Sequence, residues 1–472
     1  MASSTATVRA VEDLRGRRTV VLGLARSGVA ACRFLADHGA IVAVYDRRPA
    51  AELADEVAAL GARQVRLALG IDESAAVALL EHADLLVTSP SVSASFPTTD
   101  PWLREALGAA DARGAEIVSE VGLFLRLTQA RILGITGTKG KTTTASLVAA
   151  MLDAGGVSNA LGGNIGTPLV ERALELGPDD WAVLELSELQ LPTIGRGADV
   201  AVYTNIGEDH LDRHGTAEAY RAVKARLAEL TAPSGRVVLN HDDPGCRELG
   251  DRLPPASLAW YGWQRPGRGP VEAWIDDDWF IVAGERLLPV REVPLPGRHM
   301  RMNAMAAALA ASLVGVRPAA VSTAVRSFRG VPHRLELIGE RGGVRWVNDS
   351  QATIPVAAIA ALEAFDAPII LIAGGKDKGL AYEGFADAVA THARAVVLIG
   401  ETADALERLL GTRVPVRRAR SMEEAVATAD GLAVAGDVVL LAPAAASFDM
   451  FVDYAARGDA FRAAVAGLGG NP

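Results

Sequence analysis

The stretch Arg131-Ile-Leu-Gly134-Ile-Thr-Gly137-Thr-Lys-Gly140-Lys141-Thr142-Thr143 places a short apolar run before a glycine-rich turn, and an apolar helical pattern continues from Lys141 to Ala154. A strand, a glycine-rich turn and a helix in this order form a loop whose backbone N–H groups can surround phosphate oxygens. Lys141 would bring a cation to the terminal phosphates of a nucleotide, and the Thr142 hydroxyl would ligate Mg²⁺. The strict phosphate-loop pattern fails by one position, because five residues and not four separate its two glycines. A glycine-rich turn that carries an exposed lysine is the structural alternative.

Apolar strands alternate with helical patterns along the rest of the chain. Thr19 to Gly23, a helical stretch and Ile41 to Asp46 indicate a strand–helix–strand unit, and similar alternation resumes near residue 331. Parallel sheets covered by helices on both faces give this pattern. A length of 472 residues, at ~100–200 residues per domain, suits three domains. We therefore predict an α/β protein with mostly parallel sheets: a Rossmann-like domain at residues 1–123, a P-loop ATPase-like domain at 124–330 and a Rossmann-like domain at 331–472.

Composition and charge exclude several classes of protein. No apolar run approaches the ~20 residues of a membrane helix, so we expect no membrane insertion. The first 18 residues carry charges and no apolar signal segment, and two cysteines cannot build a disulfide framework, so we expect a cytoplasmic protein. The net charge of −10 argues against nucleic-acid binding. An anionic ligand would therefore depend on local hydrogen-bond donors and cations.

The first glycine-rich turn, Gly23 to Gly28, is a weaker nucleotide signal than the phosphate loop. It follows a strand, and Asp46 ends the next strand, where an acid would meet a ribose. Ala25 stands where the dinucleotide-binding pattern has a glycine. We expect this turn to bind a nucleotide or a diphosphate, and ordinary packing of helix on sheet is the alternative.

Two later segments add acids at predicted strand ends: Glu185-Leu-Ser187-Glu-Leu-Gln190 and Asn205-Ile-Gly-Glu208-Asp209-His210. The carboxyl ends of parallel strands lie along one edge of a sheet, the edge that also carries the phosphate loop. Mg²⁺ prefers carboxylates and phosphate oxygens and tolerates one imidazole. We expect Glu185 and His210 to bind metal; a loop histidine and a solvated acidic turn are the alternatives.

Together these motifs resemble those of the Mur ligases, the ATP-dependent amide ligases of peptidoglycan precursor synthesis. The matching motifs follow the family's order over nearly the whole chain: residues 137–143, 162–166, 185–190, 205–212, 295–299, 333–336, 348–350 and 441–447. Within the family the chain is most similar to the enzymes that add glutamate to UDP-N-acetylmuramoyl-L-alanine. The resemblance implies that ATP converts the alanyl carboxylate into an acyl phosphate, which the amino group of glutamate, with the D isomer favoured, then attacks.

The resemblance also implies roles for individual residues. ATP would be held by the phosphate loop and three later residues: Gly137, Thr138, Lys139, Gly140, Lys141, Thr142, Thr143, Asn303, Arg334 and Asp349. Mg²⁺, at two sites, would be ligated by Thr142, Glu185, His210 and a carbamylated Lys224; the catalytic residues would be Lys141, His210 and Lys224. The UDP-linked substrate would meet Gly23, Arg26, Ser27, Asp46, Arg47, Asn164, Ser187 and Gln190, and glutamate would meet Thr353, Lys378, Ser447 and Tyr454. The expected partners are these small molecules alone, and we expect a monomer.

Three departures from the family pattern stand out, one of them a serine in Ser89-Pro90-Ser91 where a glycine is common. Gln351 stands where relatives usually have a lysine, so either Lys376 or Lys378 compensates or the preference for D-glutamate over L-glutamate differs. Met300 replaces the usual asparagine, which leaves Asn303 as the expected adenine partner.

Other functions stay open on the sequence alone. One is another amide ligase of the superfamily, including one that acts on folate. An NAD-dependent dehydrogenase would use the first glycine-rich turn and Asp46 but leaves the phosphate loop unexplained. A nucleotide-binding regulator would use that loop as a switch without amide chemistry. For Lys224, a lysine on a helix surface is the structural alternative.

Overall fold

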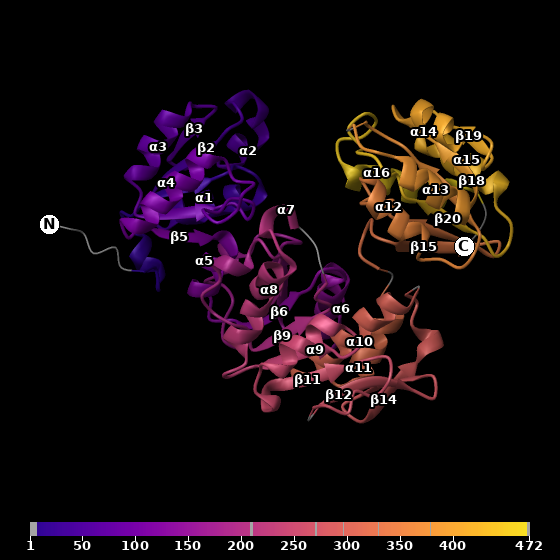
Figure 1. Ribbon diagram of the computed structural model, residues 1–472, viewed down its shortest axis with the longest axis horizontal. Helices are drawn as coiled ribbons and strands as arrows, with labels where there is room; N and C mark the ends of the chain where they lie inside the picture. The colour runs from indigo at the N-terminus through magenta and orange to yellow at the C-terminus, as the bar shows by residue number, and fades with distance from the viewer. Residues whose placement is uncertain are drawn as a thin grey trace. The chain divides into compact units, whose positions relative to one another are not determined.

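Figure 1 shows the computed structural model, which describes residues 7–207, 211–269, 271–295, 297–328, 330–377 and 379–469. Within these ranges the strands form three sheets, each built from its own stretch of the chain, and most neighbouring strands run parallel. The predicted α/β architecture with mostly parallel sheets is therefore confirmed. Among the residues described, no helix has the length and apolar character that a bilayer span requires.

The first sheet has five parallel strands in the order β3-β2-β1-β4-β5. Its strands are β1 (Arg18–Leu22), β2 (Ile41–Asp46), β3 (Val65–Leu69), β4 (Leu85–Thr88) and β5 (Glu116–Ser119). Its helices are α1 (Arg26–Asp37), α2 (Ala54–Ala59), α3 (Glu73–Glu81) and α4 (Pro101–Ala112). The strand order reverses between β1 and β4, the place where open α/β sheets usually bind ligands.

The second sheet has nine strands in the order β14-β13-β12-β11-β10-β9-β6-β8-β7. They are β6 (Arg131–Thr136), β7 (Asn159–Gly163), β8 (Trp181–Glu185), β9 (Val200–Tyr203), β10 (Arg236–Asn240), β11 (Leu258–Tyr261), β12 (Glu272–Asp276), β13 (Trp279–Val282) and β14 (Glu285–Pro289). The helices of this region are α5 (Glu120–Leu127), α6 (Lys141–Ala154), α7 (Leu211–His214), α8 (Ala217–Thr231), α9 (Pro244–Asp251), α10 (Gly297–Leu313) and α11 (Pro318–Ser327). Strands β12 to β14 are joined as antiparallel hairpins.

We did not expect these hairpins. Their two-residue turns, Asp277-Asp278 and Ala283-Gly284, have positive φ at both positions. Such turns match the twist of paired strands, but their usual sequence signal is Asn-Gly or Asp-Gly. The signal was therefore too weak to predict this part of the sheet.

The third sheet has six strands in the order β15-β16-β20-β17-β18-β19, and β15 alone among the described strands of this sheet runs antiparallel to its neighbour. Its strands are β15 (Glu336–Arg341), β16 (Val344–Asn348), β17 (Ile369–Ala373), β18 (Ala393–Leu398), β19 (Val416–Arg418) and β20 (Val438–Leu441). Its helices are α12 (Pro355–Leu362), α13 (Glu383–His392), α14 (Ala403–Leu410), α15 (Met422–Leu432) and α16 (Tyr454–Gly467).

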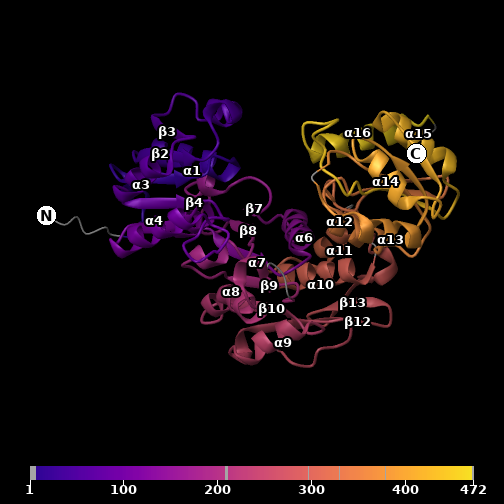
Figure 2. The same cartoon turned by 45° about the horizontal axis from the view of Figure 1, so that its top comes forward.

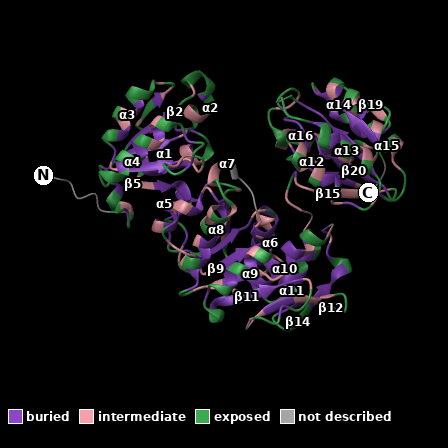
Figure 3. Ribbon diagram, viewed as in Figure 1, coloured by how far each residue is buried: buried purple, intermediate pink, exposed green. Residues whose placement is uncertain are grey.

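Successive side chains of β17 show why this sheet is covered on both faces. Leu371 belongs to an apolar core with residues of α12, α13 and α14, whereas Ile370 and Ile372 belong to another core with residues of α15 and α16. The side chains of a strand point alternately to its two faces, so an unbroken apolar run needs helices on each. Figure 2 shows these elements from a second direction, and Figure 3 shows the strands buried between helices with exposed outer surfaces.

The chain divides into two compact units. One reaches Val293 and includes Met302–Arg326, and the other comprises Pro294–Arg301 and the chain from Ser327 onward. The first unit contains the first two sheets, and a single apolar core includes residues of both, such as Val44 and Leu184. The second unit contains the third sheet.

Helix α5 connects the first two sheets and begins at a buried acid. The Ser119 hydroxyl caps the helix by accepting from the Gly122 N–H at 3.0 Å, and it pairs with the Thr193 hydroxyl at 2.6 Å. Glu120 Oε1 accepts from the Val170 N–H at 2.9 Å, and Glu120 is only 5% exposed. Burial raises the pKa of Glu120 from 4.5 to about 7, against the lowering effect of its backbone hydrogen bonds.

We expect Glu120→Gln to stabilise the protein in a pH-dependent way. Because folding raises the pKa of Glu120, the folded state binds the proton of this carboxyl more tightly than the unfolded state does. The free energy of unfolding therefore falls as pH rises from about 4.5 through 7. The neutral amide keeps an acceptor for Val170 and avoids this loss, so the free energy of unfolding should rise by about 3 kcal/mol at pH 8 and hardly at all near pH 4.5. Urea unfolding at both pH values measures this, with the exposed Glu52→Gln as control. A difference that does not depend on pH would contradict the assignment.

Candidate active site

The phosphate loop connects β6 to α6 and requires its glycines. Gly137 and Gly140 have φ values of +149° and +86°. A Cβ atom at Gly137 would collide with Thr204 Oγ1, and one at Gly140 would lie 2.5 Å from Asn303 Oδ1. Gly134 lies inside β6, so the loop itself begins at Gly137 and the spacing counted from Gly134 does not apply. The loop is therefore a tight backbone turn at the N-terminus of a helix of 14 residues, an arrangement suited to phosphate.

Lys141 folds back over this loop. Its Nζ donates to the carbonyl oxygens of Gly137 at 3.0 Å and Thr138 at 2.9 Å. Asn205 holds the loop in place: its Oδ1 accepts from the N–H groups of Thr138 and Lys139 at 3.1 and 2.9 Å, and its Nδ2 donates to Lys139 O at 3.0 Å. Thr142 and Thr143 are buried in the first turn of α6, whereas Lys139 is exposed. Asn205 belongs to one of the motifs of the sequence, but the motif alone does not predict that Asn205 holds the loop.

Glu185, at the end of β8, has a buried carboxylate oxygen without a hydrogen-bond partner among the described residues. The residue is 1% exposed, and its Oε1 accepts from Asn164 Nδ2 at 2.9 Å. Its Oε2 has no hydrogen-bond partner in the part of the chain that the structure describes. Burying a carboxylate oxygen without a partner costs free energy, and a bound cation would offset that cost.

The rest of the expected metal site is incomplete in the structure. His210, with Glu208 and Asp209, lies outside the described residues. Within the described ranges, no group of three or more His, Cys, Asp or Glu side chains is placed to hold a metal. Divalent cations at Glu185 would therefore need further oxygens, such as those of phosphates.

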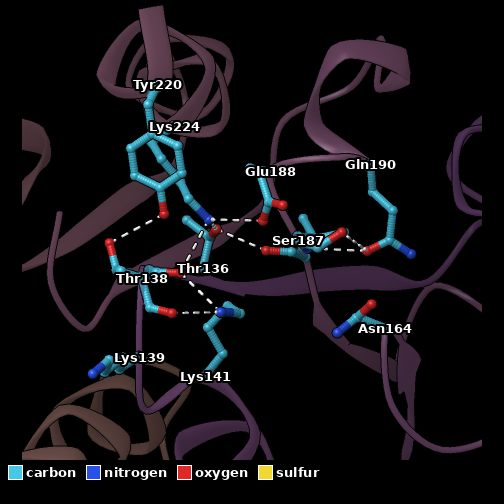
Figure 4. A network of polar contacts seen from close by, with 12 residues as sticks. Thr136, Thr138, Lys139, Lys141, Asn164, Ser187, Glu188, Gln190, Tyr220 and Lys224 are labelled. Carbon is cyan, nitrogen blue, oxygen red and sulfur yellow. Dashed lines mark hydrogen bonds and ion pairs between the residues drawn. The ribbon is translucent and has the colours of Figure 1, made fainter. Parts of the chain in front are cut away.

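Lys224 is fully buried, so the interpretation of this residue as a surface lysine is wrong. Its Nζ donates to Thr136 Oγ1 at 3.2 Å and Gly137 O at 3.0 Å, and it lies 4.0 Å from Glu188 Oε2. Figure 4 shows the Lys224 amine between Glu188 and the phosphate loop. Helix α8 thus brings a lysine to the edge of the sheet where the loop and Glu185 lie.

Tyr220 also joins α8 to the loop, although no sequence pattern singled it out. Its hydroxyl pairs with Thr138 Oγ1 at 3.1 Å, and its ring centroid is 5.5 Å from Lys224 Nζ. Tyr220 and Lys224 are four residues apart on one helix, a spacing that places both side chains on one face. This spacing of four residues is the sequence signal that could have pointed to Tyr220.

Three further residues that the resemblance assigns to the UDP-linked substrate, Asn164, Ser187 and Gln190, lie near Glu185. Ser187 donates to Gln190 Oε1 from its N–H at 3.0 Å and its hydroxyl at 3.1 Å. Asn164 is bonded to Glu185, as described above. Figure 4 shows Asn164, Ser187 and Gln190 gathered on one side of the loop. The expected convergence at the carboxyl end of β8 is what the structure shows.

A cavity of about 600 Å³ opens at the carboxyl ends of β1, β2 and β4 in the first sheet. The residues of this region that we expected to bind the UDP-linked substrate all line it: Gly23, Arg26, Ser27, Asp46 and Arg47. Ser89, Trp102 and Arg213 line it as well. The cavity includes the point where the strand order reverses, the usual ligand position in such sheets.

Asp46 is occupied by protein donors. The Arg48 side chain donates to it at 3.0 and 2.9 Å, and the Leu24 N–H donates at 2.9 Å. Burial would raise the pKa of Asp46, but the hydrogen bonds from Arg48 and Leu24 lower it to about 2. Asp46 is thus an anion that fixes Arg48 at the cavity, while the neighbouring Arg47 is exposed there.

In the second unit, Asp349 follows β16 and is buried. Its Oδ1 accepts from the Leu335 N–H at 2.9 Å. Burial raises the pKa of Asp349 to about 6, against this hydrogen bond and the charge of Arg334. Thr353 is half-buried just beyond, before α12. Asn303 lies in the first unit beside Gly140, as described above.

A buried arginine that we had not singled out ties together the segments around the expected glutamate site. Arg457 donates to Ser350 Oγ and Ser350 O at 3.0 and 2.9 Å, and to the carbonyls of Ala445 and Ala446 at 3.0 and 3.2 Å. Ser350 Oγ donates in turn to Tyr454 O at 2.7 Å. Burial lowers the pKa of Arg457 to about 10, so it stays charged at neutral pH.

These contacts bring the segments of three of the four expected glutamate residues together. Ser447 is buried and Tyr454 is exposed, with its ring centroid 6.1 Å from that of His333. Lys378 lies outside the described residues. Lys376 is the other lysine that could compensate for the missing cation at position 351. It is paired with Glu401 at 2.7 Å, and the hydrogen bond from Lys376 to Glu401 raises the pKa of Lys376.

Three family models match the chain. They are Mur ligase MurD-like, N-terminal domain, over residues 17–119; Mur ligase middle domain, over 135–311; and Mur ligase, glutamate ligase domain, over 333–445. The UDP-N-acetylmuramoylalanine–D-glutamate ligase of Solibacter usitatus is 39% identical over 96% of this chain and 99% of its own. That of Nitrosococcus oceani is 40% identical over 95% and 96%. A solved structure of UDP-N-acetylmuramate-alanine ligase from Thermotoga maritima aligns with a TM-score of 0.56 at 18% identity, covering 96% of this chain and all of that one.

Proposed function

The chain belongs to the Mur ligase family, and from this premise we propose that it is the ATP-dependent ligase that joins D-glutamate to UDP-N-acetylmuramoyl-L-alanine. The observation that carries the proposal is the meeting of Lys141, Lys224 and Glu185 at one sheet edge. A dehydrogenase has no use for a buried lysine and a buried carboxylate beside a phosphate loop, and the product assay below separates the ligase from a nucleotide switch. The names and lengths of the relatives support the substrate assignment.

We divide the work among three regions of the chain. Residues 1–123 would bind the UDP-linked substrate, residues 124–330 ATP, and residues 331–472 the incoming glutamate. The cavity at Asp46 and Arg47 supports the first assignment, and the phosphate loop supports the second. Because the reaction consumes ATP, we place the enzyme in the cytoplasm.

Activation of a carboxylate is the chemical problem that this site must solve. The alanyl carboxylate takes the terminal phosphoryl group of ATP, ADP leaves, and the amino group of glutamate then displaces phosphate to form the amide. Negative charge grows on the transferring phosphoryl group, and fixed donors and cations stabilise it. Lys141, the loop N–H groups from Gly137 to Thr143 and the N-terminus of α6 would supply them, with Asn303, Arg334 and Asp349 as further ATP contacts.

The chemistry that bound Mg²⁺ would supply here is neutralisation of part of the negative charge of the phosphates. We propose two sites, with Thr142, Glu185, His210 and a carbamylated Lys224 as protein ligands. The unpaired Glu185 Oε2 and the burial of Lys224 beside the loop support these assignments. Glutamate would be held by Thr353, Lys378, Ser447 and Tyr454. Arg457 helps to position the segments of these residues, apart from that of Lys378, which lies outside the described residues.

We expect Arg47→Ala to weaken the binding of UDP by about tenfold. Arg47 is exposed and lines the cavity of the first sheet, where a guanidinium can bind a diphosphate, whereas Asp46 already holds Arg48. Isothermal titration with UDP measures the affinity. Arg66→Ala, which removes an exposed arginine elsewhere on this sheet, is the matched control for lost charge. Equal affinity in the two variants would contradict the assignment of the cavity.

The proposed function is tested by incubating the purified chain with Mg-ATP, UDP-N-acetylmuramoyl-L-alanine and D-glutamate and analysing the products by mass spectrometry. We expect the glutamyl product and ADP in equal amounts. ADP formed without the glutamyl product would favour a nucleotide switch, and neither product would exclude the ligase.

A further inference from the structure

Glu188 is a buried acid for which the proposed chemistry has no use. It lies in the motif Glu185-Leu-Ser187-Glu188-Leu-Gln190 and is only 5% exposed. Its Oε2 lies 4.0 Å from Lys224 Nζ. Buried acids are uncommon unless they are paired or bind a metal, so this carboxylate needs an explanation.

The surroundings of the Lys224 amine are arranged for a positive charge. Thr136 Oγ1 and Gly137 O, from adjacent residues at the end of β6, and Glu188 Oε2, from the segment after β8, all lie within 4.0 Å of Nζ. Figure 4 shows the amine between these groups. As an ammonium, Lys224 neutralises Glu188, and the pair tolerates burial because each charge is compensated.

Carbamylation would reverse the charge at this point. The Lys224 ammonium loses one proton to become an amine, the amine nitrogen forms a bond to the carbon of CO₂, and a second proton leaves that nitrogen. Two protons thus pass to solvent, and a group of charge +1 becomes one of charge −1. The carbamate would then lie beside Glu188, with the unpaired Glu185 Oε2 in the same motif. Two neighbouring negative charges that are both buried repel strongly, and a divalent cation is the simplest group that offsets both.

We propose that Glu188 makes the carbamylation of Lys224 depend on the bound divalent cation. Without the cation, Lys224 stays an ammonium paired with Glu188; with the cation, the carbamate forms and Glu188 contributes to the negative site that holds the metal. Glu188 is thus a positioning residue for the metal site. The inference rests on the proposed function, because the carbamate belongs to it.

The test is carbon-13 NMR of the purified chain in labelled bicarbonate, with and without Mg²⁺. We expect the carbamate signal of the unsubstituted protein to rise about tenfold or more when Mg²⁺ is added. In Glu188→Gln the signal should be similar with and without Mg²⁺, and in Glu188→Asp, which keeps the charge, the dependence should return. Lys224→Ala, which has no amine there, identifies the signal.

A second measurement gives the metal affinity directly. Electron paramagnetic resonance should show Mn²⁺ binding to Glu188→Gln about tenfold more weakly than to the unsubstituted protein. If circular dichroism shows that Glu188→Gln does not fold, Glu188→Ser replaces it in both measurements.

A carbamate signal that is equal with and without Mg²⁺ in the unsubstituted protein would overturn the inference, and so would a neutral variant that keeps the dependence. The absence of any carbamate would overturn it together with the proposed role of Lys224. The ligase proposal is tested apart from these outcomes by the formation of the glutamyl product.

Discussion

Replacing Lys141 by alanine is expected to lower the rate of ligation by about a thousandfold while leaving the fold intact. The lysine ammonium is the one side-chain cation that we assign to the ATP phosphates in the loop, and it donates to the loop carbonyls of Gly137 and Thr138. Removing a group that stabilises charge in the transition state of such a reaction costs rate more than binding. The core of α6 is formed by other side chains, such as Leu147 and Val148, so the helix keeps its packing.

The measurement is phosphate release under saturating substrates, with circular dichroism to confirm folding. Lys139→Ala is the matched control, because Lys139 is exposed in the same loop and we assign it a backbone contact with ATP. Its loss should be far smaller than that of Lys141→Ala. Near-normal turnover of Lys141→Ala would contradict the assignment of this loop to ATP.

Lys224→Ala should lose ligation by a similar factor, about a thousandfold, and regain part of it when acetate or formate is added. The substitution removes a fully buried side chain beside Thr136, Gly137 and Glu188 and leaves a space there. A short carboxylate can enter such a space and replace the carbamate as a metal ligand. We expect the restored rate to saturate with carboxylate concentration and to exceed the unassisted rate by about tenfold.

Initial rates against acetate concentration measure this, with sodium chloride at equal ionic strength as the control for salt. Lys141→Ala offers a second control, because an added anion cannot replace its lost cation. Full activity of Lys224→Ala without any additive would show that neither the lysine nor its carbamate is needed.

Local patterns predicted the elements that hold the site. The helix expected from Lys141 to Ala154 and the strand expected from Ile41 to Asp46 have those same bounds in the structure. The helix lies between Gly140 and Gly155, and the strand is an apolar run that ends at Asp46, so the local pattern marks the bounds of both. The rule that parallel strands end along one edge also brought Glu185, Ser187 and the loop together, as the structure shows.

Local sequence patterns did not predict the contacts between residues that lie far apart in the chain. Lys224 shares a helix with exposed charges, and its complete burial depends on the loop that α8 meets 88 residues earlier in the chain. Asp46 was expected to meet a ribose, but its oxygens accept from Arg48 and Leu24. Arg457 likewise has a role set by segments more than 100 residues away, which no local periodicity records.

The most direct test of the function is phosphate release by the purified chain with Mg-ATP and UDP-N-acetylmuramoyl-L-alanine in three parallel reactions. One contains D-glutamate, one L-glutamate and one no amino acid. We predict release only with D-glutamate, which would mean that the pocket compensates for Gln351. Release with L-glutamate alone would keep the ligase chemistry and reverse the assigned stereochemistry. Release that neither isomer stimulates would contradict the proposed function.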